Sequence, residues 1–337
     1  MQDQPEASSP NTPRVLFVVG MWRSGTSLIH ALINRHPQVA LMYEAEPLEL
    51  WPQGPGLLRR QDWPQRLEFF NQTFSRHHLE MPAVASTLPG PMGALSLYRE
   101  YARNRGASII GEKAPSYHTR LPTLGKLFPD AQFLIIWRDP IECCRSAARA
   151  ARKNRFFAQR GMSQRMLFGA ETLALGVEEL FRQKRDVCEA VYDELVSDPE
   201  RELRRVCAFL KIPFEPAMLD LKSADVSSVP SGEHHGGVRS GVIGKTVQAD
   251  EILPAEFIAK GGRYAARWRA RFSTLGFARA LPTLPVNAPS FGEQLVDGCV
   301  KNFWRAVDGQ KKILFRNIPL SWWARLRAKV PRTQSRA

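Results

Sequence analysis

The sequence predicts an α/β fold in which helices cover both faces of a mostly parallel central sheet, giving three layers, α/β/α. Three observations support this prediction. Apolar strand candidates alternate with helical patterns along the 337 residues. A turn rich in glycine and hydroxyl groups joins the first strand to the first helix, as in a P-loop. Two later helices begin at Asp-Pro pairs, in which the acid can cap the helix and the proline fits its first position.

The first strand and the helix after it frame the glycine-rich turn. Val15–Val19 is a β-branched and aromatic run, typical of a buried parallel strand, and Gly20 ends it. Apolar residues then recur at helical spacing, at Leu28, Leu32 and Ile33. Backbone N–H groups at the start of such a helix point outward, so the turn is suited to bind a phosphate.

The turn differs from the loop of enzymes that use nucleoside triphosphates. Gly20 and Gly25 have the spacing of that loop, but Thr26 stands at the position of its lysine. The basic residue lies inside the turn instead, at Arg23. We therefore expect a nucleotide whose phosphates are arranged differently from those of a triphosphate.

The remaining elements are expected from apolar runs, helical spacing and turn residues. Strands are predicted at Ser108–Ile110, which Gly111 ends, at Phe133–Trp137 and at Val187–Tyr192. Helices are predicted at Tyr117–Phe128, from Asp139-Pro140 onward, at Ser163–Asp186 and at Asp198–Leu210. Residues 47–105 show only a weak helical pattern, and residues 222–250 form a loop rich in Gly, Ser and His. Both segments are candidates for lids over a site.

A second pair of residues also points to a phosphate. Arg138 follows the strand Phe133–Trp137, and Ser146 lies eight residues further on, about two turns into the next helix. An arginine at a strand end and a serine on the following helix can bind one phosphate from two sides. Taken alone the spacing is weak, because Arg138 could pair with Asp139 or Glu142 instead.

With these motifs the chain resembles the sulfotransferases that use 3′-phosphoadenosine-5′-phosphosulfate (PAPS). It looks most like the bacterial members and the Golgi types that modify protein tyrosine or heparan sulfate. Three motifs and a later segment are similar, and the similarity runs from Arg14 to Trp268. They are the 5′-phosphosulfate loop at Gly20–Ser27, the Glu-Lys-Thr-Pro-Ala-Tyr segment at Gly111–Tyr117, the 3′-phosphate motif at Phe133–Ser146, and Tyr192–Leu210. The departures are Trp22 and Ala114, which replace smaller or hydroxyl-bearing residues.

The resemblance implies a donor site and a catalytic set. PAPS would be the co-substrate, without a metal, and adenosine 3′,5′-bisphosphate (PAP) the product. The catalytic residues would be Glu44 as general base, with Glu46 in reserve, Arg23 at the leaving phosphate and Lys113 at the bridging oxygen. Lys113 could instead be a surface lysine that pairs with Glu112. The donor would be held by Arg23, Ser24, Gly25, Thr26, Ser27, Arg138, Ser146, Tyr192 and Lys245. Arg239 and Ser240 are alternatives to Lys245.

The domain organisation follows from the same resemblance. We expect a disordered lead at residues 1–13, a sulfotransferase domain at 14–284 that contains both lid or acceptor segments, and a C-terminal extension at 285–337. The acceptor would be a hydroxyl group of a glycan, a lipid-linked molecule or a peptide.

The net charge indicates the kind of partner, and the cysteines indicate the cellular compartment. The net charge is +14, and ten lysines and arginines against the single acid Asp308 lie between Cys299 and Ala337, among aromatic residues. We prefer a tail packed on the domain and keep an anionic membrane surface as the alternative. No nucleic-acid motif is present. Five cysteines, two of them adjacent at Cys143 and Cys144, do not form a disulfide pattern, so we expect a cytoplasmic protein.

Two other functional classes stay open at this stage. One is a degenerate kinase-like nucleotide-binding protein, which the absence of a lysine after Gly25 disfavours. The other is a non-catalytic, membrane-associated binding protein with a vestigial nucleotide site. The histidine pairs His77-His78 and His234-His235 have no acid or cysteine at metal-ligand spacing, so no metal site is predicted.

Overall fold

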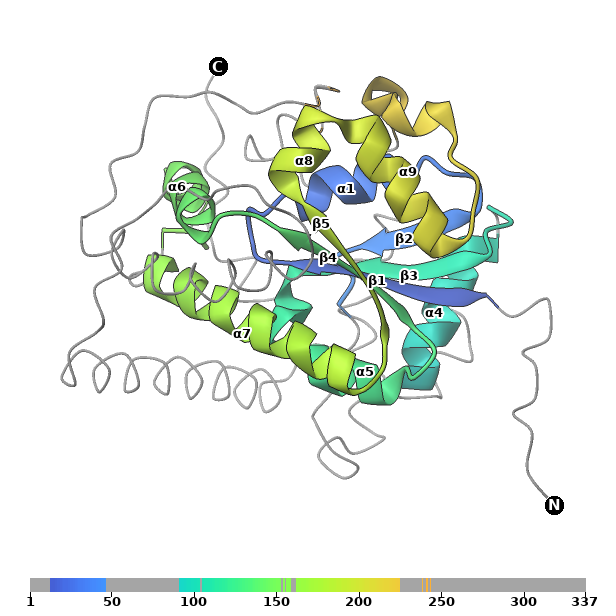
Figure 1. The fold of residues 1–337 in the computed structure, drawn as a ribbon, viewed down its shortest axis with the longest axis horizontal. Helices are drawn as coiled ribbons and strands as arrows, with labels where there is room; N and C mark the ends of the chain where they lie inside the picture. Colours follow the sequence, from blue (N-terminus) through green and yellow to red (C-terminus); the bar gives the residue numbers. More distant parts are fainter. Residues whose placement is uncertain are drawn as a thin grey trace, which may run out of the picture.

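The computed structural model describes residues 13–46, 91–103, 105–152, 154, 156–158 and 162–224, together with positions 238, 241 and 243 (Figure 1). The C-terminal extension, Lys245, Arg239, Ser240 and most of the two predicted lid segments lie outside these residues, but Pro91–Arg103 of the first segment form a helix. No helix within the described ranges is both long and apolar enough to cross a membrane.

The centre of the fold is a five-stranded sheet with the order β2-β3-β1-β4-β5. Its strands are β1 (Arg14–Gly20), β2 (Val39–Tyr43), β3 (Ile109–Lys113), β4 (Gln132–Trp137) and β5 (Asp186–Val191). All four neighbouring pairs run parallel, with Val18 opposite both Lys113 and Leu134. The prediction of a mostly parallel sheet is therefore confirmed.

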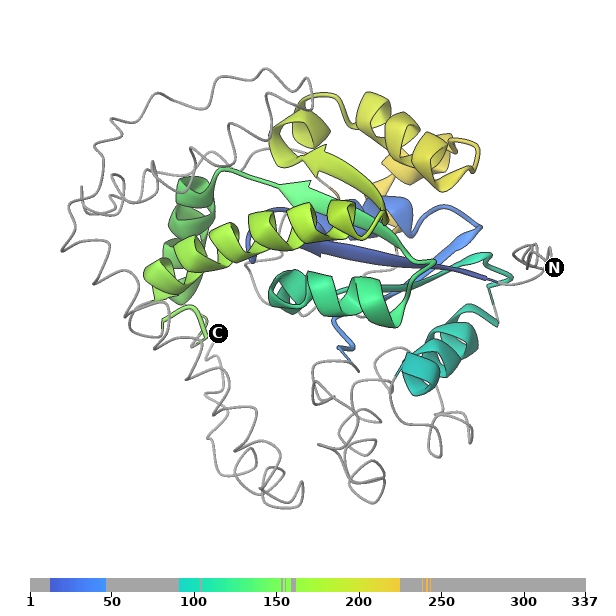
Figure 2. The same ribbon diagram turned by 60° about the horizontal axis from the view of Figure 1, so that its bottom comes forward.

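Helices cover both faces of this sheet, as predicted (Figure 2). Alternate side chains of β1 point to opposite faces, so that Phe17 and Leu16 belong to two separate cores. On the face of Phe17 lie α4 (Pro91–Arg103), the 3₁₀-helix η3 (Pro115–Thr119), α5 (Leu121–Leu127), α6 (Pro140–Ala151) and α7 (Met162–Arg182). On the face of Leu16 lie α1 (Thr26–Ile33), α8 (Tyr192–Ser197), α9 (Pro199–Leu210) and the short 3₁₀-helices η4 (Pro216–Leu219) and η5 (Leu221–Ser223).

Helix caps explain where two of these helices begin. The carboxylate of Asp139 accepts hydrogen bonds from the backbone N–H groups of Ile141 and Glu142, and that of Asp198 accepts one from Arg201. Both acids are followed by a proline at the first helical position, where its missing N–H costs no hydrogen bond. The sequence prediction of both starts is confirmed.

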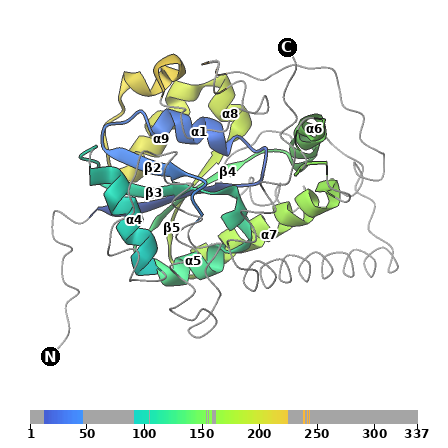
Figure 3. The ribbon, with the colours of Figure 1, turned by 180° about the vertical axis from the view of Figure 1, so that it is seen from behind.

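Several elements differ from the sequence expectations. The strand predicted to end at Gly111 continues to Lys113. Gly111 does not end the strand: it stands where the backbone (φ 138°) approaches Leu16 too closely for any side chain. The helix predicted at Tyr117–Phe128 is divided into η3 and α5 at Arg120. Tyr192 opens α8 instead of ending β5. Figure 3 shows two elements that were not predicted, β2 and α4, at the β2 edge of the sheet.

The direction of the strands places the candidate functional residues together. The carboxyl ends of parallel strands meet at one edge of a sheet, and ligands of open α/β folds bind outside that edge. The turn with Arg23 follows β1, Glu44 follows β2, Lys113 ends β3 and Arg138 follows β4. Four residues predicted from separate motifs therefore share this edge.

Candidate active site

The glycine-rich turn after β1 is closed by its own serine. The buried hydroxyl of Ser24 donates to the carbonyl oxygen of Met21 at 2.7 Å, and its backbone N–H donates to the same oxygen at 3.1 Å. The first hydrogen bonds of α1 run from Leu28 and Ile29 to the carbonyl of Gly25. The N–H groups of Thr26 and Ser27 precede that ladder, as in a helix start that binds an anion.

Two residues of the turn have left-handed backbone conformations. Arg23 has φ 70° and Gly25 has φ 99°. At Gly25 a Cβ atom would also lie 2.3 Å from Cδ2 of Tyr192, so that only glycine fits beneath this ring. Tyr192, the first residue of α8, thus packs directly on the turn.

Arg23 connects the turn to the second phosphate motif. Its Nε donates to the hydroxyl of Ser146 at 3.0 Å. Nη1 of Arg138 donates to the backbone carbonyl of Arg23 at 2.9 Å, and its guanidinium lies 4.3 Å from the centre of the Tyr192 ring. Arg138 therefore does not serve as a partner of its neighbour Asp139, whose carboxylate caps α6. The turn, β4, α6 and α8 converge on one cationic group.

The electrostatics of this group favour an anion. Burial, with the nearby guanidinium groups of Arg138 and Arg149 as further causes, lowers the pKa of Arg23. Arg149 lies three residues after Ser146 on α6 and hence on the same helix face. Bringing partly buried like charges together is unfavourable unless a negative group joins them. The arrangement suits a phosphate.

A second cluster surrounds Lys113 at the end of β3. The side chain is fully buried, and Nζ lies 2.5 Å from Oε1 of Glu44, 3.4 Å from Oγ of Ser27 and 3.3 Å from the centre of the Tyr43 ring. The hydroxyl groups of Ser27 and Tyr43 are 2.8 Å apart. Lys113 is thus not at the surface. It is also not paired with Glu112, because adjacent residues of a strand point to opposite faces. Despite the Glu44 carboxylate, burial lowers the pKa of Lys113.

The two candidate carboxylates lie in a strained loop after β2. Glu44 (φ 46°) and Glu46 (φ 52°) both have left-handed backbones, which non-glycine residues seldom adopt and which often mark functional sites. The carboxylate of Glu44 contacts Lys113, whereas Oε1 of Glu46 accepts a hydrogen bond from the hydroxyl of Ser116. Glu44 is therefore the carboxylate that faces the glycine-rich turn.

Aromatic side chains also surround Trp22, the second residue of the turn after Gly20. Trp22, which the sequence marks as a departure from the resembled family, has its ring 4.8 Å from His118 and 5.5 Å from Phe156. The guanidinium of Arg165, from α7, lies 5.1 Å from the Trp22 ring. The bulky residue in the turn is thus accommodated by packing against α7 and the segment before it.

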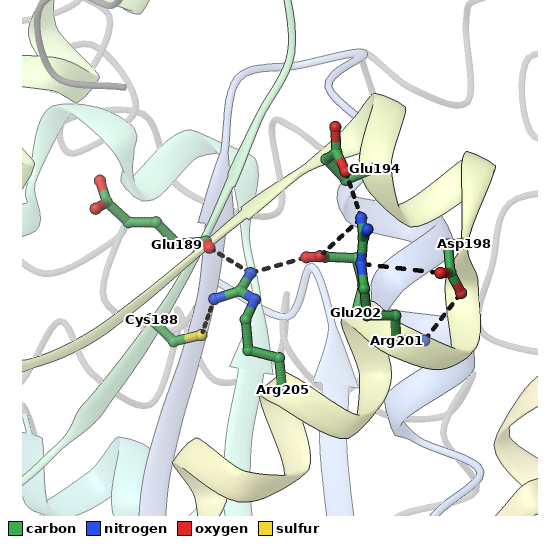
Figure 4. A network of polar contacts seen from close by, with 7 residues as sticks. All are labelled: Cys188, Glu189, Glu194, Asp198, Arg201, Glu202 and Arg205. Carbon is green, nitrogen blue, oxygen red and sulfur yellow. Dashed lines mark hydrogen bonds and ion pairs between the residues drawn. The ribbon is translucent and has the colours of Figure 1, made fainter. Parts of the chain in front are cut away.

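A polar network fixes α8, and so Tyr192, to the sheet (Figure 4). Glu202, almost fully buried on α9, accepts from Arg205 at 2.8 Å and contacts Arg201. Arg205 also donates to the backbone carbonyl of Glu189 at 2.5 Å, and Arg201 pairs with Glu194 of α8. Strand β5 and helices α8 and α9 are held together by these contacts.

Most of the predicted site residues meet at this edge. They are Arg23, Ser24, Gly25, Thr26, Ser27, Glu44, Lys113, Arg138, Ser146 and Tyr192, whereas Lys245 lies outside the described residues. The hydroxyl of Ser24 points into the turn, so any contact of this residue with a ligand stays a prediction. Sequence reasoning missed the contributions of Tyr43 and Glu112. Tyr43 precedes Glu44 in an apolar run, which was a usable signal. In the described part of the chain, no three metal-binding side chains gather in one place.

Comparison with known proteins identifies relatives of the chain. A protein-family model with the description "Sulfotransferase family" matches residues 13–216 of the chain. Protein-tyrosine sulfotransferase 1 of Danio rerio is 27% identical over 213 residues, which cover 61% of this chain and 55% of that protein. Nodulation protein NoeE of Sinorhizobium fredii (strain NBRC 101917 / NGR234) is 25% identical over 237 residues, with coverages of 61% and 51%. The chain spans about half the length of the curated relatives it matches.

Solved structures share the fold. The sulfotransferase domain from the Synechococcus PCC 7002 olefin synthase has a TM-score of 0.51 and 19% identity, covering 83% of this chain and 100% of that domain. The sulfotransferase domain from the curacin biosynthetic pathway has the same TM-score and 18% identity, covering 77% and 98%. At such identities the similarity concerns the fold alone, and it confirms the predicted α/β architecture.

Proposed function

The chain belongs to the sulfotransferase family, and from this premise we propose that it transfers a sulfuryl group from PAPS to a hydroxyl group of an acceptor. One observation supports this function more than any other. The two guanidinium groups of Arg23 and Arg138, with the hydroxyl of Ser146, lie at the same sheet edge as the pair of Lys113 and Glu44. A donor with phosphates at two positions needs the arginine and serine side chains to bind them. The transfer of the sulfuryl group needs the lysine and the carboxylate.

The donor would occupy the glycine-rich turn and the group beside it. Arg138 and Ser146 would bind the 3′-phosphate, in agreement with their positions after β4 and on α6. The N–H groups at the start of α1, with the hydroxyl groups of Thr26 and Ser27, would bind the 5′-phosphosulfate. Tyr192 would support both parts, since its ring contacts the turn and Arg138.

The transfer itself follows the logic of phosphoryl transfer. The acceptor oxygen attacks sulfur while the bond between sulfur and the bridging oxygen of the 5′-phosphate breaks. Glu44 takes the acceptor proton, and the charge that develops on the leaving phosphate is stabilised by Arg23, Lys113 and the N–H groups of the turn. Lys113 is poised for this role because its Nζ already contacts both Ser27 of the turn and Glu44.

Glu44 is proposed as the base in preference to Glu46. Its side chain is 36% exposed and contacts Lys113, so it can meet both an acceptor that arrives from solvent and the leaving group. Glu46 instead binds Ser116 at 2.8 Å, on the 3₁₀-helix that follows β3. The hydrogen bond to Ser116 draws this carboxylate away from the glycine-rich turn.

The acceptor, the partners and the location are proposed more broadly. A peptide tyrosine, a glycan hydroxyl and a lipid-linked alcohol all offer the required nucleophile, and protein-tyrosine sulfotransferases are among the relatives. A cytoplasmic location and a tail that contacts an anionic membrane stay predictions. Flotation of the full chain with anionic vesicles tests the membrane contact, and a chain that stays at the bottom of the gradient would contradict it.

Transfer of radiolabelled sulfate from PAPS tests the function directly. The full chain is incubated with PAPS and, in parallel, with a tyrosine peptide, an unsulfated glycan and a lipid-linked alcohol. Label in one acceptor, with stoichiometric release of PAP and no requirement for magnesium, is the expected result. A parallel reaction contains ATP labelled in its γ-phosphate, with magnesium. Transfer of labelled phosphate from ATP without transfer of labelled sulfate from PAPS would favour the kinase-like alternative and contradict the proposal.

A further inference from the structure

Glu112 is a buried carboxylate that the proposed chemistry does not use. It precedes Lys113 on β3 and lies opposite Phe17 of β1 and Met42 of β2. Its side chain is fully buried on the face of the sheet that α4 and η3 cover, away from the Lys113 side chain. An isolated buried carboxylate is strongly unfavourable, so its partners show what it holds in place.

Three donors from three different segments converge on this carboxylate. The hydroxyl groups of Tyr98, on α4, and Tyr117, on η3, both donate to Oε1, the latter at 2.6 Å. The backbone N–H of Glu46 donates to Oε2 at 2.8 Å. The two tyrosines are fully buried, so they fix the orientation of the carboxylate from one side. The second oxygen of the Glu112 carboxylate, Oε2, then faces the loop after β2.

The loop from Glu44 to Glu46 is held at both ends by neighbouring residues of β3. The N–H of Glu44 donates to the backbone carbonyl of Lys113 at 2.9 Å, and the N–H of Glu46 donates to Glu112. Between these two bonds the chain makes a bend with left-handed residues at Glu44 and Glu46. Such conformations persist only where the surroundings over-determine them, and the bond to Glu112 is one of those constraints.

We propose that Glu112 is a positioning residue: it holds the strained Glu44–Glu46 loop so that the carboxylate of Glu44 faces Lys113 and the glycine-rich turn. The inference rests on the proposed function, in which Glu44 is the base. Glu112 itself touches neither donor nor acceptor. Its oxygen acts on the backbone two residues beyond Glu44, and a small shift of a base is enough to reduce turnover strongly.

A purely structural role would make a different prediction. In that case Glu112 would serve only to satisfy the two buried tyrosine hydroxyl groups, and turnover would follow stability. The two roles separate in a pair of variants. Glu112→Met keeps the volume but removes the acceptor and leaves two phenol groups buried without it. The triple variant Glu112→Met, Tyr98→Phe, Tyr117→Phe removes those phenol groups as well, while the loop still lacks its anchor.

The experiment compares the wild-type chain with both variants by thermal unfolding, steady-state kinetics and hydrogen–deuterium exchange of a peptide containing residues 44–46. We expect the melting temperature to fall in the single variant and to recover in the triple variant. The kcat value is expected to fall about 10- to 100-fold in both, with the KM for PAPS changed less than about threefold. Exchange in the loop should be faster in both variants than in the wild type.

Two results would overturn the proposal. One is a kcat that recovers together with the melting temperature in the triple variant, which would assign Glu112 a structural role alone. The other is loop exchange that stays at the wild-type rate in both variants. The exchange measurement needs no turnover, so it decides the anchor even if the wild-type chain transfers no sulfate and the proposed function fails. If Glu112→Met does not fold, the triple variant is compared with the wild type directly, and a wild-type kcat or a wild-type rate of loop exchange in it would overturn the proposal.

Discussion

Nη1 of Arg138 donates to the backbone carbonyl of Arg23 at 2.9 Å, across a sequence separation of 115 residues. This contact joins two motifs that the sequence offers separately, the glycine-rich turn after β1 and the arginine after β4. Because Arg23 in turn donates to Ser146, a ligand that binds one of the three residues is expected to depend on the others. The candidate donor site is one connected unit, and its members can be tested individually.

Glu44→Gln should reduce kcat by about 100-fold or more, because an amide cannot take the proton from the hydroxyl group that receives the sulfuryl group. The affinity for PAP should change little, since Glu44 is proposed to act on the acceptor and not to bind the donor. Steady-state kinetics and calorimetry provide the two measurements. Glu46→Gln is the matched control, and its kcat should remain within a few-fold of the wild type. A loss of PAP binding in Glu44→Gln would assign this residue to the donor site instead.

Lys113→Met should abolish most turnover and yet leave the fold as stable as the wild type or more so at neutral pH. The pKa of Lys113 is lowered by burial, so the unfolded chain binds more protons than the folded chain between that lowered value and the ordinary value near 10.5. The destabilising effect of the charged lysine is therefore greatest below the lowered pKa and disappears as the pH rises through this window. Glu44 is partly exposed and stays solvated without its partner.

The measurement for Lys113→Met is the difference in melting temperature between variant and wild type, recorded from pH 7 to pH 10. We expect the difference to favour the variant most at pH 7 and to decrease toward pH 10. A difference that grows with pH would mean that Glu44 stabilises the charged form more than burial opposes it.

Gly25→Ala should destabilise the fold and eliminate donor binding. A left-handed alanine costs about 1–2 kcal/mol, and its Cβ would in addition collide with the Tyr192 ring. Gly106→Ala is the matched control, since Gly106 also has a positive φ but no atom within 4 Å of the added Cβ. The control should lose only about 1 kcal/mol in chemical denaturation and bind PAP normally. Equal losses in both variants would show that Tyr192 does not restrict the turn.

Arg205→Ala should destabilise the fold by about 2–3 kcal/mol, because Glu202 would stay buried with fewer partners. Arg204→Ala is the control from the same helix. Its partner Glu200 is half exposed, so the loss of that ion pair should cost less than about 1 kcal/mol. Urea unfolding measures both, and equal effects would contradict the importance of the network in Figure 4.

The sequence predicted the elements whose signals are local. The apolar runs of β1 and β4 and the Asp-Pro starts of α6 and α9 are recognisable within a few residues. It missed β2, whose five residues resemble any short apolar run until β3 pairs with them. Gly111 suggested a strand end, because a glycine that permits close approach to Leu16 and a glycine that ends a strand look the same in sequence.

The site shows the same division. The candidate phosphate-binding residues could be predicted because a strand, a turn and a helix follow one another in the chain. The burial of Lys113 and its pairing with Glu44 depend on the neighbouring positions of β2 and β3, which no local pattern encodes. The role proposed for Glu112 depends on contacts with Tyr98, Tyr117 and Glu46, which only the folded chain brings together.

The measurement that tests the central claim most directly is calorimetric titration of PAP into the wild-type chain and into Arg138→Ala, with ATP and magnesium titrated in parallel. The account predicts that PAP binds tightly to the wild type, that Arg138→Ala loses this binding, and that ATP with magnesium binds much more weakly. Binding of ATP with magnesium in preference to PAP, or binding of neither nucleotide, would contradict it.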